Sequence, residues 1–286
     1  MTTLLNIIIG GLIMGGIYAI ISMGLSMQYG VARILNVSHG EFIMLGAFLT
    51  WTLSQAGISP LLSLVIVSPP LFLIGFIIHR TAFKRLSSIS GGGAFEGNAM
   101  LVSFGLMFIL QNVAMIIWGS SPQGYQFLVK SVTLGGATFA VNRLVVLLFA
   151  LVISIGFYFF LSRSRIGKSI RAASQDPIAA GLMGVKINRV MALCFAIGAL
   201  LAGLAGVLLS MIYQINTAMG MSYTVIAIIV VVLGGLGSIP GSLIGGFILG
   251  LVGSAVSYIE PSLQLVAYYV IIMLLLLVRP KGLLGR

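Results

Sequence analysis

Charged side chains are scarce in this sequence. They make up 7% of the 286 residues, whereas a soluble domain carries about 25%. Only 4 residues are Asp or Glu and 15 are Lys or Arg, while 59% are hydrophobic. So little charge cannot cover the surface of a water-soluble globule, and a disordered chain needs the opposite composition. The composition therefore excludes a soluble enzyme and a disordered protein, and it indicates a protein of the lipid bilayer.

Residues that hold metals, disulfides or nucleotides are also missing from the sequence. Cys194 is the only cysteine, which excludes an intrachain disulfide and a cysteine metal site. Neither G-x-x-x-x-G-K-[ST] nor H-E-x-x-H occurs, so we expect no metal and no cofactor on this chain. The net charge of +11 comes without interleaved basic and aromatic residues, so we expect no nucleic-acid partner. If ATP drives the protein, another chain has to bind it.

The hydrophobic residues gather in about nine segments. A transmembrane helix needs about 20 apolar residues, so the sequence predicts a single all-α domain, residues 1–286, that forms a polytopic membrane helix bundle. We expect about 8–10 transmembrane segments, some of them broken or re-entrant, because 42–53 and 223–233 are short. The segments are 4–27, 42–53, 60–78, 98–118, 144–161, 190–213, 223–233, 243–259 and 263–278.

The basic residues predict the orientation of the chain. Alternate crossing of nine segments places 13 of the 15 Lys and Arg residues on one side, which the positive-inside rule identifies as the cytoplasm. We therefore expect the N-terminus outside and the C-terminus in the cytoplasm. Lys130 and Arg143 then face outward. The 13 are Arg33, Arg80, Lys84, Arg85, Arg163, Arg165, Lys168, Arg171, Lys186, Arg189, Arg279, Lys281 and Arg286.

Two breaks interrupt the hydrophobic pattern, each just before a helix rich in small residues. Short or Gly/Pro-interrupted segments in corresponding halves of a transporter often mark its binding site. The similarity between the two breaks is one of composition and suggests a weak internal duplication. We predict that the substrate pathway runs past Asn36, Ser38, His39, Gly40, Glu41, Gly234, Gly235, Gly237, Ser238, Pro240 and Gly241.

Simpler structural roles are open for the same residues. Ser38 and Glu41 have the spacing of a capping box, in which each would satisfy a backbone N–H of the other. His39 is a candidate for hydrogen bonding at the helix start, and the glycine-rich break can equally serve close helix packing. Glu41 is also an acid near the membrane interior, and such residues usually face a cavity or a pathway.

The longest basic loop, residues 163–189, contains a short helix by prediction. Asp176 has the character of an N-cap, Pro177 suits the first helical position, and Gly184 suits a C-terminal cap. Ala172, Ala173, Ala179 and Ala180 offer a small-residue surface that favours docking into a partner's groove. The alternative is a basic loop that only fixes topology.

Four segments together resemble the branched-chain amino acid ABC transporter permease family. They are 36–42 (NVSHGEF), 171–177 (RAASQDP) with 182–184 (LMG), 233–241 (LGGLGSIPG) and 279–285 (RPKGLLG). They follow one another in the family's order, and the similarity extends from about residue 4 to the last residue. Within the family the chain resembles the shorter of two permease subunits.

The resemblance implies a multisubunit importer in a bacterial-type plasma (inner) membrane. Its partners would be two ATP-binding subunits, a second paralogous permease and an extracytoplasmic solute-binding protein, with ATP bound by the partner subunits. Branched-chain amino acids are the default substrate, and relatives import urea, short amides or other small polar solutes. Residues 163–189 resemble the loop that couples to the ATPase, through Arg171, Ala172, Ala173, Asp176, Pro177, Ala180 and Gly184.

A different class of transporter is the main alternative. A stand-alone secondary carrier or channel would work without an ATPase, but an ion-coupled carrier usually needs ionisable residues in its spans. Residues 190–259 contain no charged residue, and Glu41 is the one acid near an inner span. A membrane enzyme is not expected, because no catalytic constellation is apparent.

Overall fold

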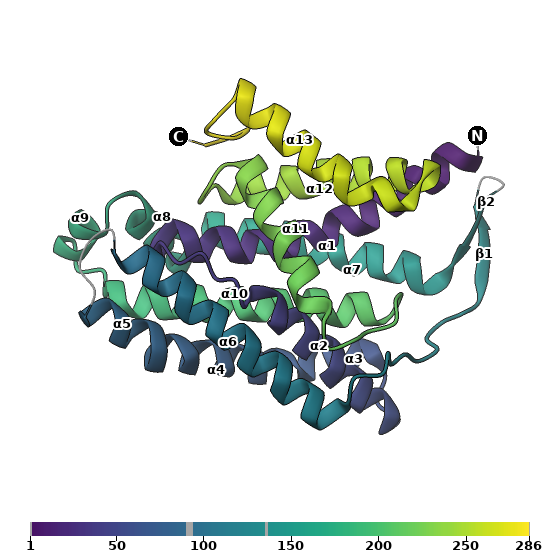
Figure 1. Ribbon diagram of the computed structural model, residues 1–286, viewed down its shortest axis with the longest axis horizontal. Coiled ribbons are helices and arrows are strands. Elements are labelled where there is room, and N and C mark those ends of the chain that lie inside the picture. Colours follow the sequence, from purple (N-terminus) through teal and green to yellow (C-terminus); the bar gives the residue numbers. More distant parts are fainter. Residues whose placement is uncertain (1, 90–93, 135–136, 286) are drawn as a thin grey trace.

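The computed structural model describes residues 2–89, 94–134 and 137–285, and these fold into a helical bundle (Figure 1). Within these ranges, seven helical stretches are long and apolar enough to cross a membrane. They are α1 (Thr2–Ala32), the stretch from α3 (Pro60–Ile66) through α4 (Ser68–Ile78) and a π-helical turn (His79–Phe83) into α5 (Lys84–Ile89), α6 (Ala94–Trp118), α7 (Val141–Arg163), α10 (Ile187–Ser210), α12 (Ile239–Ile259), and a 3₁₀ turn (Pro261–Leu263) with α13 (Gln264–Val278).

Two shorter helices correspond to the two short hydrophobic segments. They are α2 (His39–Gln55) and α11 (Met219–Gly234). Every one of the nine segments expected from the sequence is therefore helical, and the all-α polytopic bundle is confirmed. Seven of the nine helical segments are long enough to span a membrane. Helices α2 and α11 are shorter, and each begins after a non-helical connection.

Small elements fill the two ends of the bundle. The hairpin of β1 (Ser131–Leu134) and β2 (Ala137–Ala140) lies next to the N-terminus, where α7 begins. At the opposite end lie α5, α8 (Arg165–Gln175), α9 (Pro177–Leu182) and the C-terminal segment (Figure 1). The elements that carry the four groups of basic residues therefore gather at one end of the molecule, except that Arg286 lies outside the described residues. The hairpin that follows Lys130 and the start of α7 with Arg143 lie toward the other end.

Helix α1 forms the centre of the bundle and packs along α12 through glycines. A Cβ atom on Gly11 would lie 2.8 Å from the Cα of Leu251, and one on Gly15 would lie 2.8 Å from the Cα of Phe247. A Cβ on Gly250 would overlap the backbone of Gly15. In a membrane, where the hydrophobic effect does not drive helices together, such close backbone approach supplies the packing that holds them.

The inner helix α10 also packs closely on its neighbours α2 and α4 through glycines. Gly206 meets the backbone of α2 at Ile43, Gly203 accommodates the Leu71 side chain of α4, and Gly75 of α4 lies against Ala199. Most of α10 is buried, whereas α13 and α6 expose large apolar side chains over most of their length. The bundle is thus built as inner helices α1, α2 and α10 with outer helices whose apolar faces suit contact with lipid.

We predict that Gly250→Leu prevents α1 and α12 from reaching their native separation. Overpacking usually costs roughly 1–3 kcal/mol, and here the obstacle is backbone, which cannot rotate away. Thermal unfolding of the purified protein in detergent measures the loss. Gly156→Leu is the matched control, because a Cβ at Gly156 meets no other atom within 4 Å. Equal stability of the two variants would contradict the packing described for α1 and α12.

Candidate functional site

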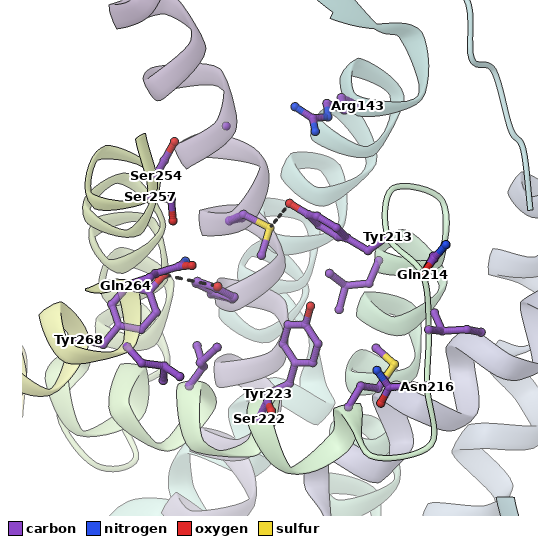
Figure 2. A pocket seen from close by; sticks show the side chains of 18 of the residues that line it. Arg143, Tyr213, Gln214, Asn216, Ser222, Tyr223, Ser254, Ser257, Gln264 and Tyr268 are labelled. Carbon is purple, nitrogen blue, oxygen red and sulfur yellow. Dashed lines mark hydrogen bonds between the residues drawn. The ribbon is translucent and has the colours of Figure 1, made fainter. Parts of the chain in front are cut away.

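A cavity of about 750 Å³ lies at the end of the bundle that holds the N-terminus and the hairpin (Figure 2). This volume is in the range of pockets that hold small molecules, about 300–1,000 Å³. Its walls come from α1, α7, α11, α12, α13 and the connection between α10 and α11. The lining residues are Asn6, Gly10, Met14, Tyr18, Arg143, Leu209, Tyr213, Gln214, Ile215, Asn216, Ala218, Met219, Ser222, Tyr223, Ile226, Ser254, Ser257, Gln264, Leu265 and Tyr268.

The cavity combines aromatic hydroxyls with apolar surface. Figure 2 shows Tyr213 and Tyr223 on one side and Tyr268 with Gln264 on the other. The Nε2 of Gln264 donates to the hydroxyl of Tyr268 at 2.7 Å, and the Tyr268 ring packs edge to face on Tyr18 with centroids 6.3 Å apart. The remaining wall mixes aliphatic and thioether side chains with serine, asparagine and glutamine side chains. Such a lining suits a small solute with an apolar body and a few polar groups.

Charge in the cavity is limited to one residue. Among the described residues that line it, Arg143 alone is charged, and the other polar side chains offer hydroxyl and amide groups. Within the described ranges, no three His, Cys, Asp or Glu side chains come together as a possible metal site.

The first break, residues 36–41, is buried inside the bundle and does not line the cavity. The Asn36 Oδ1 accepts from the backbone N–H of Ser38 at 3.1 Å and from its hydroxyl at 2.6 Å. The Nδ2 of Asn36 donates to the Oε1 of Gln28 at 3.3 Å, and Gln28 donates to the Phe195 carbonyl at 3.2 Å. The break therefore connects α1 and α10 through amide side chains.

The start of α2 is bonded to α11 as well. The hydroxyl of Thr224 accepts from the backbone N–H of Gly40 at 2.8 Å and lies 3.2 Å from the carbonyl of Val37. The Glu41 carboxylate packs against Gly220, one turn earlier on α11. A ring nitrogen of His39 lies 3.0 Å from the carbonyl of Ile21 on α1, consistent with the hydrogen-bonding role expected at the helix start.

The capping box expected from Ser38 and Glu41 is wrong. Ser38 stands at the N-cap position but makes no side-chain cap bond. Its hydroxyl donates to Asn36 instead, at 2.6 Å, because that carboxamide lies only two residues away and shares the buried site. A short polar side chain next to the cap can compete in this way for the capping group.

The second break, residues 234–241, lies at the other end of α11, near the basic end of the bundle. Gly235 and Gly237 have φ of 101° and 79°, which an L side chain rarely adopts. Ser238 caps α12, accepting from the N–H of Gly241 at 3.2 Å, and Pro240 lies in the first turn of that helix. A Cβ on Gly237 would lie 3.1 Å from the Cα of Gly30 on α1.

The chain after α13 covers this second break. The backbone N–H of Leu283 donates to the Leu233 carbonyl at 2.9 Å, and that of Leu284 donates to the Gly234 carbonyl at 3.1 Å. Gly282 and Gly285 lie directly against Gly235. The eleven residues predicted for the pathway thus lie at or beside the two ends of α11. They do not line the cavity, and their contact with substrate stays a prediction.

The short helix expected in the basic loop is present as α9. One Asp176 carboxylate oxygen accepts from the N–H groups of Ile178 and Ala179, at 2.8 and 3.0 Å. Pro177 starts the helix, and Gly184 follows it with φ of 87°. The helix boundaries were therefore correctly indicated by cap chemistry alone.

The exposed surface of this loop differs from the alanine surface expected. Ala173 and Ala180 are buried against the rest of the chain, while Ala172 and Ala179 are exposed. Large apolar side chains project instead: Ile178 is 76% exposed, Leu182 86% and Met183 86%. Arg171 turns inward, and its guanidinium donates to the carbonyls of Leu161 and Ser162 at the end of α7. The alanines thus position the helix, and the larger side chains form its free face.

Sequence reasoning did not identify the cavity. Its lining comes from six parts of the chain, and no two of its tyrosines share a motif. A weak signal lay between Tyr213 and Tyr223, where polar residues separate two hydrophobic segments.

The apolar spans and the end cavity are features of an integral membrane transport protein. The chain belongs to the family of branched-chain amino acid transport system permease components, whose model matches residues 7–278. No solved structure matches it.

The curated relatives cover nearly the whole chain. The high-affinity branched-chain amino acid transport system permease protein BraD of Pseudomonas aeruginosa is 31% identical over 98% of this chain and 95% of its own length. The LivH permease protein of the corresponding high-affinity system in Escherichia coli K12 is 31% identical, over 96% and 94%. The ribose import permease protein RbsC of Haemophilus influenzae is more distant, at 26% over 91% and 80%.

We predict that Thr224→Val weakens the attachment of α11 to α2. The variant leaves the N–H of Gly40 buried without an acceptor, which costs about 1–3 kcal/mol. Thermal unfolding measures this loss. Thr50→Val is the matched control, because Thr50 is equally buried but only donates to Gly46 within its own helix, at 2.8 Å. The attachment is unimportant if both valine variants unfold at the same temperature.

Proposed function

We propose that this chain is the transmembrane permease subunit of an ATP-binding-cassette importer that carries branched-chain amino acids. The family match over residues 7–278 supports the transport role, and the names of the relatives support the substrate. The single observation that favours an ATP-driven system is the free apolar face of α9 on an otherwise basic loop. Such a face needs a partner, because exposed large apolar side chains outside a bilayer are costly.

The proposed partner of α9 is an ATP-binding subunit. Ile178 and Leu182 are four residues apart, the spacing of anchors that a helix inserts into a groove. Asp176 and Pro177 fix the start of the helix, Gly184 ends it, and Ala173 with Ala180 allow it to lie close to the bundle. Arg171, next to Ala172, connects the loop to the end of α7, so movement of the partner would be transmitted to a spanning helix.

This assignment gives the orientation. The basic end of the bundle with α5, α8, α9 and the C-terminal segment would face the cytoplasm, as the positive-inside rule requires. The N-terminus and the cavity would then face the outside of a bacterial-type inner membrane, where a solute-binding protein could deliver substrate. A second, paralogous permease would complete the pathway, and two ATP-binding subunits would drive it.

Helix α11 is the element we propose to alternate between the two access states. It contributes Met219, Ser222, Tyr223 and Ile226 to the cavity and ends at the second break. The first break, residues 36–41, packs against the outer half of α11, and the second break, residues 234–241, lies at its inner end. Both would act as hinges beside the pathway. Positive-φ glycines suit a hinge because they permit backbone rotations that other residues resist.

The importer predicts a defined composition and energy source. Gentle purification of the tagged chain should recover two ATP-binding subunits and a second permease, identified by mass spectrometry. Liposomes that contain this complex, with the cognate binding protein outside, should take up leucine only when ATP is present inside. Leucine uptake by the chain alone, without ATP, would instead establish a stand-alone carrier or channel.

Leu182→Asp should detach the ATP-binding subunits while the chain still inserts in the membrane. The aspartate would place a charge in the partner's apolar groove, so we expect at least a tenfold loss of co-purified ATPase and of ATP-driven uptake. Gln175→Asp introduces the same charge at an exposed position of the same loop and should retain both. Normal recovery of the ATPase with Leu182→Asp would rule out α9 as the docking element.

A further inference from the structure

Arg143 occupies an unusual electrostatic position at the cavity. It lies in the first turn of α7, which contains no acidic residue, and its side chain is exposed. Its backbone N–H donates to the Oδ1 of Asn142 at 2.8 Å, and within the described ranges its guanidinium makes no hydrogen bond or ion pair with another residue. Figure 2 shows the side chain at the edge of the cavity, on the same side as Tyr213. A cation in this place attracts an anionic group rather than another part of the chain.

No acidic side chain among the described lining residues offsets the charge of Arg143. Glu260, an acid at this end of the bundle, does not line the cavity, and its carboxylate accepts from the hydroxyl of Ser262 at 2.8 Å. Clefts lined by one sign of charge concentrate ligands of the opposite sign. The cavity is therefore arranged for a negatively charged group at the Arg143 side.

The residues beside Arg143 define the rest of the ligand. Arg143 shares a small recess of about 30 Å³ with Gly10, Ile13, Met14, Ile212 and Tyr213, and the recess adjoins the main cavity. The polar lining beyond Arg143 consists of neutral groups, the hydroxyls and amides already described. A ligand with one carboxylate and an apolar branched body fits this arrangement, since a guanidinium binds a carboxylate through two parallel hydrogen bonds.

We propose that Arg143 binds the carboxylate of the transported solute in the outward-facing cavity. This inference rests on the proposed import function and assigns one residue to substrate selection. The same guanidinium could instead bind a surface carboxylate of the solute-binding protein, and the experiment below separates the two sources.

The test uses the purified, assembled transporter in nanodiscs without binding protein. Its thermal stability is measured against increasing leucine, 4-methylpentanoate, which lacks the ammonium group, and leucinol, which lacks the carboxylate. We expect stabilisation by leucine and 4-methylpentanoate, with leucinol at least tenfold weaker. Arg143→Gln should weaken the first two ligands at least tenfold, and Arg143→Lys should restore part of the effect. Lys130→Gln, which removes a charge outside the cavity lining, should match the wild type.

Three results would overturn the proposal. One is no stabilisation of the wild type by leucine, and another is equal stabilisation by all three ligands. The third is an Arg143→Gln variant that keeps ligand stabilisation but needs more loaded binding protein to reach half-maximal uptake, which would assign Arg143 to protein docking. The import function is read separately, from ATP-driven uptake by the wild type, so its failure is distinct from failure of the Arg143 assignment.

Discussion

Inside a bilayer every backbone polar group has to find its partner within the protein, and the break between α1 and α2 is where this requirement is hardest to meet. The chain leaves a helix, turns and begins another helix, and residues 36–41 are buried. Side chains from four helices supply the missing partners: Gln28, Ser103 and Thr224 bond the turn or its neighbours, and His39 bonds back to α1. The positions of α1, α2, α6 and α11 are thereby fixed relative to one another.

Glycine determines how closely the helices around this network can approach. The hydrogen bonds that cross between helices form where glycines let backbones approach closely, as Gly40 of α2 does beside Gly220 of α11 and Gly24 of α1 beside Gly198 of α10. Close helix packing and the hydrogen bonding of buried polar groups therefore depend on each other in this bundle. The cavity lies outside the tightly packed region, where tyrosine and amide side chains replace glycine at the ends of the same helices.

Much of the fold was predictable because its signals are local. Uninterrupted apolar runs located all nine helical segments, and Asp176, Pro177 and Gly184 located α9 through cap chemistry. The role of Ser38 was missed because Asn36 competes for its hydroxyl, which spacing alone does not reveal. The free face of α9 was assigned to alanines because the side of the helix that packs on the bundle depends on tertiary contacts. The cavity was not predictable, since it exists only after six parts of the chain assemble.

The pairing of residues 283 and 284 with the last carbonyls of α11 has a consequence for biogenesis. Helices α12 and α13 are synthesised between these partners, so α11 enters the membrane with an incomplete C-terminal end. The glycine-rich break cannot reach its final conformation until both later helices have been inserted. Closure of this end of the bundle is therefore a late event in the maturation of the chain.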